Sequence, residues 1–202
     1  MIHLLPFGSR VYGLTNPKSD YDFVAIACGD YVPEYIDTGY GSSEVEIWTV
    51  AQFKERLEAY DLKALEIYYE NNEFCRYKLN VLFPSIDKEK LRRAVSAVVS
   101  NAHVKAKKKI ADGEIYTGLK SYFHCIRILT MFNALAKHGT FKPSGFVNEL
   151  DYAYQDILRR QKDNPTTMFT LLEADYKKLL KTLQHQFKLQ CPLPDKSAWN
   201  LA

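Results

Sequence analysis

The chain has 202 residues, of which 47% are hydrophobic and 25% are charged, and its formal net charge is +3. This composition predicts a globular protein with a packed core and excludes a disordered chain. The mild basic excess is compatible with partners that carry phosphate groups but does not require them.

The sequence also bears on the cellular setting. No apolar stretch is long enough to span a bilayer, and the N-terminal segment MIHLLPF lacks the basic start of a signal peptide. The four cysteines are widely spaced and form no Cys-x-x-Cys pair, which indicates reduced thiols rather than a zinc site. We therefore expect a cytosolic protein with no membrane partner.

The chain begins with alternating strand and turn signals. Met1–Leu5 is a short apolar run that we expect to form a strand ending at Pro6. Gly8 and Ser9 then begin a turn, followed by a loop rich in turn-forming residues. Asp20–Cys28 alternates polar and apolar side chains before it becomes uniformly apolar, which is typical of a strand entering a core.

A third strand and two helices follow. The stretch SEVEIWTV, residues 43–50, alternates in the same way as the second strand. Apolar residues with helical spacing then predict short helices over 50–60 and 62–72.

From Asp87 onward the pattern is helical. Asp87 can cap a long helix that stops at Gly113, and a second helix fits residues 114–138. Two further helices fit residues 146–162 and 169–189.

The predicted fold class is therefore α+β (α/β), in two parts. We expect a small mixed β-sheet with flanking helices over residues 1–85, and an all-helical domain over residues 86–202.

Four acidic residues are candidates for catalysis. Asp20 and Asp22 are separated by one residue on a predicted strand, so their side chains share a face, with Cα atoms about 6.5–7 Å apart. Glu44 and Glu46 share a face of the next strand, and either can supply a third carboxylate. Such a set suits a two-metal site for Mg²⁺, with Mn²⁺ as an alternative. The competing interpretation is an ordinary polar entrance to a strand.

A Gly-Ser pair lies about ten residues before these aspartates. Gly8 lets the backbone approach a ligand closely, and a helical turn that starts there offers N–H groups to phosphate oxygens. Ser9 adds a hydroxyl donor and Arg10 a guanidinium. Alone, such a pair more often marks a plain turn; its combination with the Asp-x-Asp strand is more specific and indicates a nucleotide site.

The segment FGSRVYGLTNPKSDYDF resembles the signature of the DNA polymerase β-like nucleotidyltransferase superfamily. More narrowly, it resembles a bacterial and phage branch of predicted nucleotidyltransferases that includes an RNA-repair-associated group. A second similarity, in EVEIWTVAQFKERLEAYDLKALEIYY, aligns Glu44 with the third carboxylate of that branch. The branch usually has Asp at this position, so Glu46 stays an alternative.

A third similarity lies in the segment LKSYFHCIRIL. Lys120, His124 and Arg127 resemble the Lys-x-x-x-His-x-x-Arg helix of the branch and share one helical face. By resemblance these three residues would bind the nucleotide or a negatively charged substrate. A half-exposed helix face with a hydrogen-bonded histidine is the alternative.

The resemblance implies a Mg²⁺-dependent nucleotidyltransferase. Such an enzyme transfers NMP from a nucleoside triphosphate, ATP among them, to a hydroxyl acceptor and releases pyrophosphate. A run of lysines, Lys105, Lys107, Lys108 and Lys109, is either a solvated face or a track for a nucleic-acid backbone, which favours an RNA or tRNA acceptor. The rival hypotheses are an inactive nucleotide- or RNA-binding module and a toxin-like transferase that modifies tRNA or protein.

Overall fold

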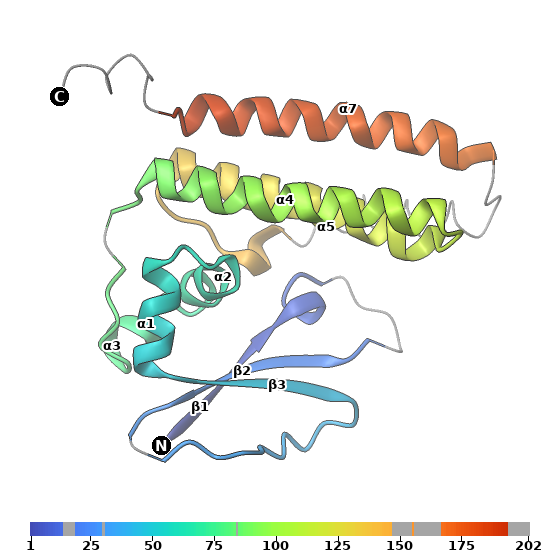
Figure 1. The fold of residues 1–202 in the computed structure, drawn as a ribbon. Helices are drawn as coiled ribbons and strands as arrows, with labels where there is room; N and C mark the ends of the chain where they lie inside the picture. Colours follow the sequence, from blue (N-terminus) through green and yellow to red (C-terminus); the bar gives the residue numbers. More distant parts are fainter. Residues whose placement is uncertain (14–18, 30, 84, 147–154, 156–166, 194–202) are drawn as a thin grey trace, which may run out of the picture. The chain divides into compact units, whose positions relative to one another are not determined.

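The computed structural model describes residues 1–13, 19–29, 31–83, 85–146, 155 and 167–193. It is a mixed α+β protein with a three-stranded sheet and several helices. The described residues fall into two compact units (Figure 1). The first holds residues 1–83 with 142–146, and the second holds residues 85–141 with 167–193.

The sheet of the first unit has the strand order β1-β2-β3. Its strands are β1 (Ile2–Phe7), β2 (Tyr21–Ala27) and β3 (Ser43–Thr49). β1 is antiparallel to β2, and β2 is parallel to β3, so the sheet is mixed as predicted. The expectation that Pro6 ends the first strand is wrong. Pro6 lies within β1, which is an edge strand and can therefore accommodate a residue that lacks an N–H donor.

One face of the sheet changes from apolar to acidic along its length. The strand registers place three rows of partners on this face. The inner two rows contain the buried side chains Leu5, Val24, Ile26 and Trp48. The row at the outer edge joins Phe7, Asp22 and Glu44. This end of the strands, which we call the acidic edge, therefore presents the carboxylates of Asp22 and Glu44 directly beyond the core.

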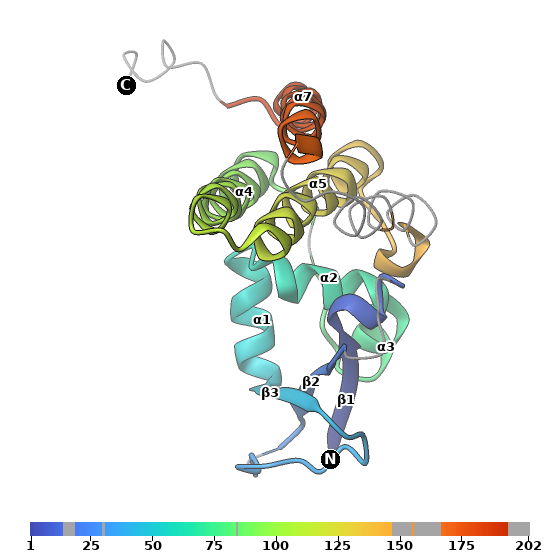
Figure 2. The same cartoon turned by 90° about the vertical axis from the view of Figure 1, so that its right-hand side faces the viewer.

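Three helices pack against this face of the sheet (Figure 2). They are α1 (Val50–Glu58), α2 (Leu62–Glu70) and α3 (Asn72–Tyr77). Phe53 of α1 stacks on Trp48 with ring centroids 6.2 Å apart, and Phe74 of α3 meets His3 edge-on at 4.7 Å. These contacts close the core at the end of the sheet that lies away from the carboxylates.

The helix boundaries follow local capping signals. Thr49 and Gln52 form a reciprocal capping box at the start of α1, and Asp61 caps α2. The predicted helices over 50–60 and 62–72 are confirmed. The separate helix α3 was not predicted.

Two polar contacts tie peripheral segments to α2. The hydroxyl of Tyr12 donates a hydrogen bond to Glu66, whose side chain is only 3% exposed. The carboxylate of Glu70 accepts from the backbone N–H and the hydroxyl of Ser144, each at 2.8 Å. The segment 142–146 is therefore held in the first unit although it follows the long helices in the sequence.

The second unit is built from α4 (Lys88–Ala111), α5 (Ile115–His138) and α7 (Thr167–Gln190). α4 and α5 lie side by side, and α7 runs along α5 (Figure 1). Asp87 caps α4 through two backbone N–H groups. These three helices are confirmed, whereas the predicted helix over 146–162 falls largely outside the described residues.

Other features of the chain agree with a buried core. The four cysteines are free thiols, and burial raises the pKa of Cys75 and Cys125 to about 12, so these two stay protonated. Among the described helices, none combines the length and apolar character needed to cross a membrane.

We expect Tyr12→Phe to lower the free energy of unfolding of the first unit by about 1–3 kcal/mol, because a buried carboxylate loses a hydrogen-bond donor. Denaturation followed by the fluorescence of Trp48 in a Trp199→Phe background measures this unit. The matched control is Tyr77→Phe, at a side chain 78% exposed, where the change should stay within about 0.5 kcal/mol. Equal effects of the two substitutions would contradict a special role for the Tyr12–Glu66 contact.

Candidate functional site

The closest approach in the candidate site joins Gly8 to Asp22. β1 leaves the sheet at Phe7, and a short turn over Gly8–Arg10 follows at once. A Cβ atom added to Gly8 would lie 2.1 Å from Oδ2 and 3.1 Å from the Cβ of Asp22. Gly8 also has a φ of +77°, a conformation that other residues rarely adopt. A larger residue here would have to displace the Asp22 carboxylate and adopt a strained φ, so two independent reasons favour glycine.

The parallel pairing of β2 with β3 brings a second carboxylate to the same place. Asp22 is the direct register partner of Glu44, so the two side chains are neighbours on one face of the sheet. Glu46 lies one row further in and forms an ion pair with Lys63 of α2, with 2.6 Å between Nζ and Oε1. Glu44 is therefore the better placed of the two glutamates for a metal shared with Asp22.

Asp20 lies at the mouth of β2, directly before its first residue. Its Oδ1 accepts a hydrogen bond from the hydroxyl of Ser42, and the backbone N–H of Tyr21 donates to the carbonyl of Ser42 at 2.9 Å. The side chain of Asp20 is exposed. Asp20 thus lies two residues before Asp22, and its second carboxylate oxygen has no hydrogen-bond donor among the described residues.

Arg10, a candidate ligand for phosphate, contacts backbone carbonyls and an aromatic ring in the structure. Its Nη2 donates to the carbonyl of Ser19 at 2.6 Å, and its Nε donates to the carbonyl of Asp20 at 3.2 Å. Its guanidinium lies 3.4 Å from the ring centroid of Tyr21. The Ser9 hydroxyl makes no hydrogen bond among the described residues, so it is available to a ligand, and the first N–H groups of the turn have no acceptor within it.

The donor set at this edge fits a hard divalent cation such as Mg²⁺ or Mn²⁺ better than it fits zinc or copper. Asp20, Asp22 and Glu44 offer oxygen atoms only, which are the ligands that Mg²⁺ prefers. Within the described ranges, no group of three acidic, histidine or cysteine side chains forms a complete metal site. Mg²⁺ commonly completes its shell with waters or substrate phosphates around one or two carboxylates, so this edge suits a metal that binds weakly alone and more tightly with a nucleotide.

The three predicted residues of the helical half lie on α5 in the second unit. Lys120 is exposed, His124 is half-buried and Arg127 is 5% exposed. Nη2 of Arg127 lies 3.2 Å from Nδ1 of His124. Burial, together with the charges of Arg127, Lys105 and Lys120, lowers the pKa of His124 to about 3. His124 is thus neutral at physiological pH, and Lys120 is the member of this set that solvent reaches most freely.

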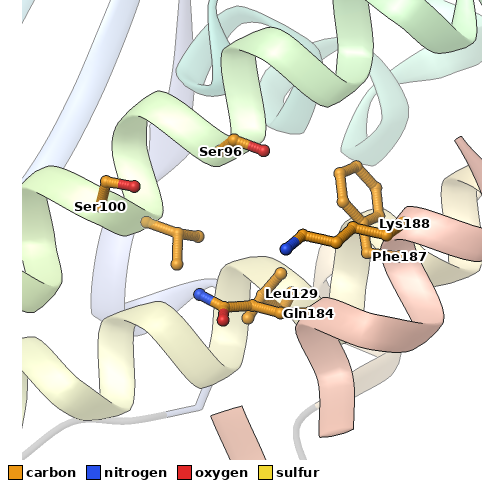
Figure 3. A pocket seen from close by; sticks show the side chains of 7 residues that line it. Ser96, Ser100, Leu129, Gln184, Phe187 and Lys188 are labelled. Atoms are coloured by element: carbon orange, nitrogen blue, oxygen red, sulfur yellow. The ribbon is translucent and has the colours of Figure 1, made fainter. Parts of the chain in front are cut away.

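A separate cavity of about 280 Å³ lies among the helices of the second unit (Figure 3). Hydroxyl, amide and ammonium groups surround its mouth and apolar side chains form its floor, the lining residues being Ser96, Val99, Ser100, Leu129, Gln184, Phe187 and Lys188. Its lining contains no carboxylate and none of the residues that the sequence singles out. The cavity therefore lacks the chemistry of a metal-nucleotide site.

The sequence did not predict the side-chain contacts that distinguish the candidate site residues from one another. Each contact joins side chains that are distant in the sequence. The pairs are Ser42 with Asp20, Lys63 with Glu46, and Tyr12 with Glu66. Tyr12 belongs to the quoted motif, but nothing in its local pattern indicates a partner on α2. The signal that could identify such pairs is tertiary, because each depends on how a loop or helix packs on the sheet.

We compared the chain with known proteins at the level of family models, curated sequences and solved structures, and none of the three gave a significant match.

We expect Gly8→Ala to destabilise the first unit by about 2–4 kcal/mol. The positive φ costs an alanine about 1 kcal/mol, and overlap with Asp22 adds about 1–3 kcal/mol. Gly39→Ala is the matched control, because Gly39 has a similar φ of +69° but nothing within 4 Å of the added atom. Urea denaturation measures both variants, and equal losses would mean that the contact with Asp22 is unimportant.

We expect His124 to make the second unit less stable in acid. Its pKa falls from 6.5 to about 3 on folding, so between these values only the unfolded chain binds the proton, and stability decreases as the pH falls. At about pH 4.5 the loss relative to pH 7 is about 2–3 kcal/mol from this group. Denaturation across this range should show a shallower slope for His124→Gln, whereas His138→Gln, at an exposed position, should keep the slope of the parent protein.

Proposed function

We propose that the chain is a Mg²⁺-dependent nucleotidyltransferase of the DNA polymerase β-like type, whose active site is the acidic edge of the three-stranded sheet. It transfers NMP from a nucleoside triphosphate to a hydroxyl acceptor and releases pyrophosphate. The observation that carries the proposal is the packing of Gly8 against Asp22, beside Glu44 in the parallel register. This contact lies between a glycine turn, whose N–H groups can bind phosphate, and carboxylates, which can bind a metal.

The roles of the residues follow from their positions. Asp20, Asp22 and Glu44 would hold the metal, which would neutralise charge on the phosphates and lower the pKa of the acceptor hydroxyl. The backbone N–H groups of the turn and the hydroxyl of Ser9 donate to phosphate oxygens. In-line attack by the acceptor oxygen on the α-phosphorus would then form the new O–P bond and break the bond to pyrophosphate, and the hydroxyl proton would pass to solvent. Glu46, paired with Lys63, supports the sheet from the row behind.

An RNA or tRNA acceptor is favoured by the basic surface of α4. Lys105, Lys107 and Lys108 are exposed, whereas Lys109 forms an ion pair with Glu114 at 2.6 Å. Three lysines within about one helical turn can neutralise phosphates of a nucleic-acid backbone, and such binding weakens steeply as salt rises. We therefore expect the acceptor to bind through charge rather than through base-specific contacts on this helix.

We expect Asp22→Ala and Asp20→Ala to abolish NMP transfer, because each removes a metal ligand while the buried core stays intact. The assay incubates the protein and Mg²⁺ with each nucleoside triphosphate, radiolabelled at the α-phosphate, together with total RNA and lysate, and follows pyrophosphate release. Glu44→Gln should reduce turnover far more than Glu46→Gln does.

Circular dichroism should confirm that the variants stay folded. Turnover retained in folded Asp22→Ala would refute the proposal. Labelled protein instead of labelled RNA would point to a protein-modifying transferase, and Mg²⁺-dependent nucleotide binding without any turnover would point to an inactive binding module.

A further inference from the structure

Arg10 connects the turn after β1 to the entrance of β2. Its Nη2 and Nε reach two consecutive backbone carbonyls, those of Ser19 and Asp20, at 2.6 and 3.2 Å. The same guanidinium lies over the ring of Tyr21, 3.4 Å from its centroid, and Tyr40 also stacks on Tyr21, with 4.4 Å between the two ring centroids. One side chain thus contacts three successive residues around a candidate metal ligand.

The geometry of these contacts requires a guanidinium. A planar group with donors in a fixed fork can satisfy two neighbouring acceptors and stack on a ring at the same time. An ammonium is a single point of charge and cannot reproduce all three contacts. Nε and Nη2 of Arg10 already donate to backbone oxygens. These two hydrogen bonds restrain residues 19 and 20 and do not involve the turn at Gly8.

We propose that Arg10 is a positioning residue: it fixes the backbone of Ser19 and Asp20 so that the Asp20 carboxylate is held at the metal site. This inference rests on the proposed function, since it assumes that Asp20 binds a metal. Ser42 complements Arg10 by restraining one carboxylate oxygen of Asp20. Groups that orient a metal ligand in this way commonly change metal affinity by about 10- to 100-fold when they are removed.

The sign of the effect separates positioning from simple electrostatics. Arg10 is a cation, so by Coulomb's law its removal should strengthen the binding of a metal cation nearby. If Arg10 instead positions Asp20, its removal should weaken metal binding despite the lost repulsion. A third role, as a phosphate clamp, would leave metal binding in the absence of nucleotide unaffected and would raise the KM for the triphosphate.

The experiment measures Mn²⁺ binding to the full chain without nucleotide, by electron paramagnetic resonance of the free ion. We expect Arg10→Ala and Arg10→Lys each to weaken Mn²⁺ binding about tenfold or more, close to the effect of Asp20→Asn. Arg56→Lys is the matched control. Arg56 also stacks on an aromatic ring, at 4.5 Å from Trp48, and pairs with Asp61, but it contacts neither Asp20 nor its loop.

Each outcome decides between the two hypotheses. Binding that depends on Asp20 and Asp22 but is unchanged or tighter in both Arg10 variants would overturn the positioning role and leave the proposed function standing. Mn²⁺ binding that is the same in the parent protein, in Asp20→Asn and in Asp22→Ala would overturn the proposed function itself. Arg10→Lys, which keeps the charge, decides the question if Arg10→Ala does not fold by circular dichroism.

Discussion

The N-terminal unit depends on one constraint, which is that a glycine Cα must lie directly against the carboxylate of Asp22. This contact fixes where β1 ends, because the chain turns away at the position where Phe7 pairs with Asp22. The parallel register of β2 with β3 then determines that Glu44 is the neighbour of Asp22. A slip of one residue in either pairing would carry a carboxylate to the opposite face of the sheet. The position of the acidic edge is therefore a consequence of strand register, which the buried rows behind it enforce.

The sequence predicted those elements whose limits are local. Thr49, Asp61 and Asp87 each cap the helix that the pattern indicates, because a capping side chain needs only backbone N–H groups two or three residues away. Gly139 ends α5 in a left-handed conformation, which is again a local preference. Pro6 shows where such reasoning fails. Whether a proline breaks a strand depends on whether the strand is central or at the edge, and only the sheet order reveals that.

The candidate site was predictable in its residue types but not in its partners. Carboxylates spaced on one strand and a glycine turn upstream are visible in the sequence, since both depend on short-range geometry. The sequence could not separate Glu44 from Glu46, because the difference is the ion pair that Lys63 makes from α2. For the same reason the sequence could not predict the carbonyl partners of Arg10, because a guanidinium signals an anionic or carbonyl partner and the fold decides which one it meets.

In the helical half, the burial of the candidate side chains was also not predictable from the sequence. Lys120, His124 and Arg127 lie on one face of α5 by rotation alone, yet their environments pass from solvent to core along that face. Periodicity fixes the direction in which a side chain leaves the helix, whereas burial depends on which neighbours cover that part of its length. Arg127 can only donate, so His124 accepts at Nδ1, and a neutral ring must then carry its proton on Nε2. A pattern that suggests a charged surface for phosphate therefore contains, in this fold, a partly buried hydrogen-bonded pair with one exposed lysine beside it.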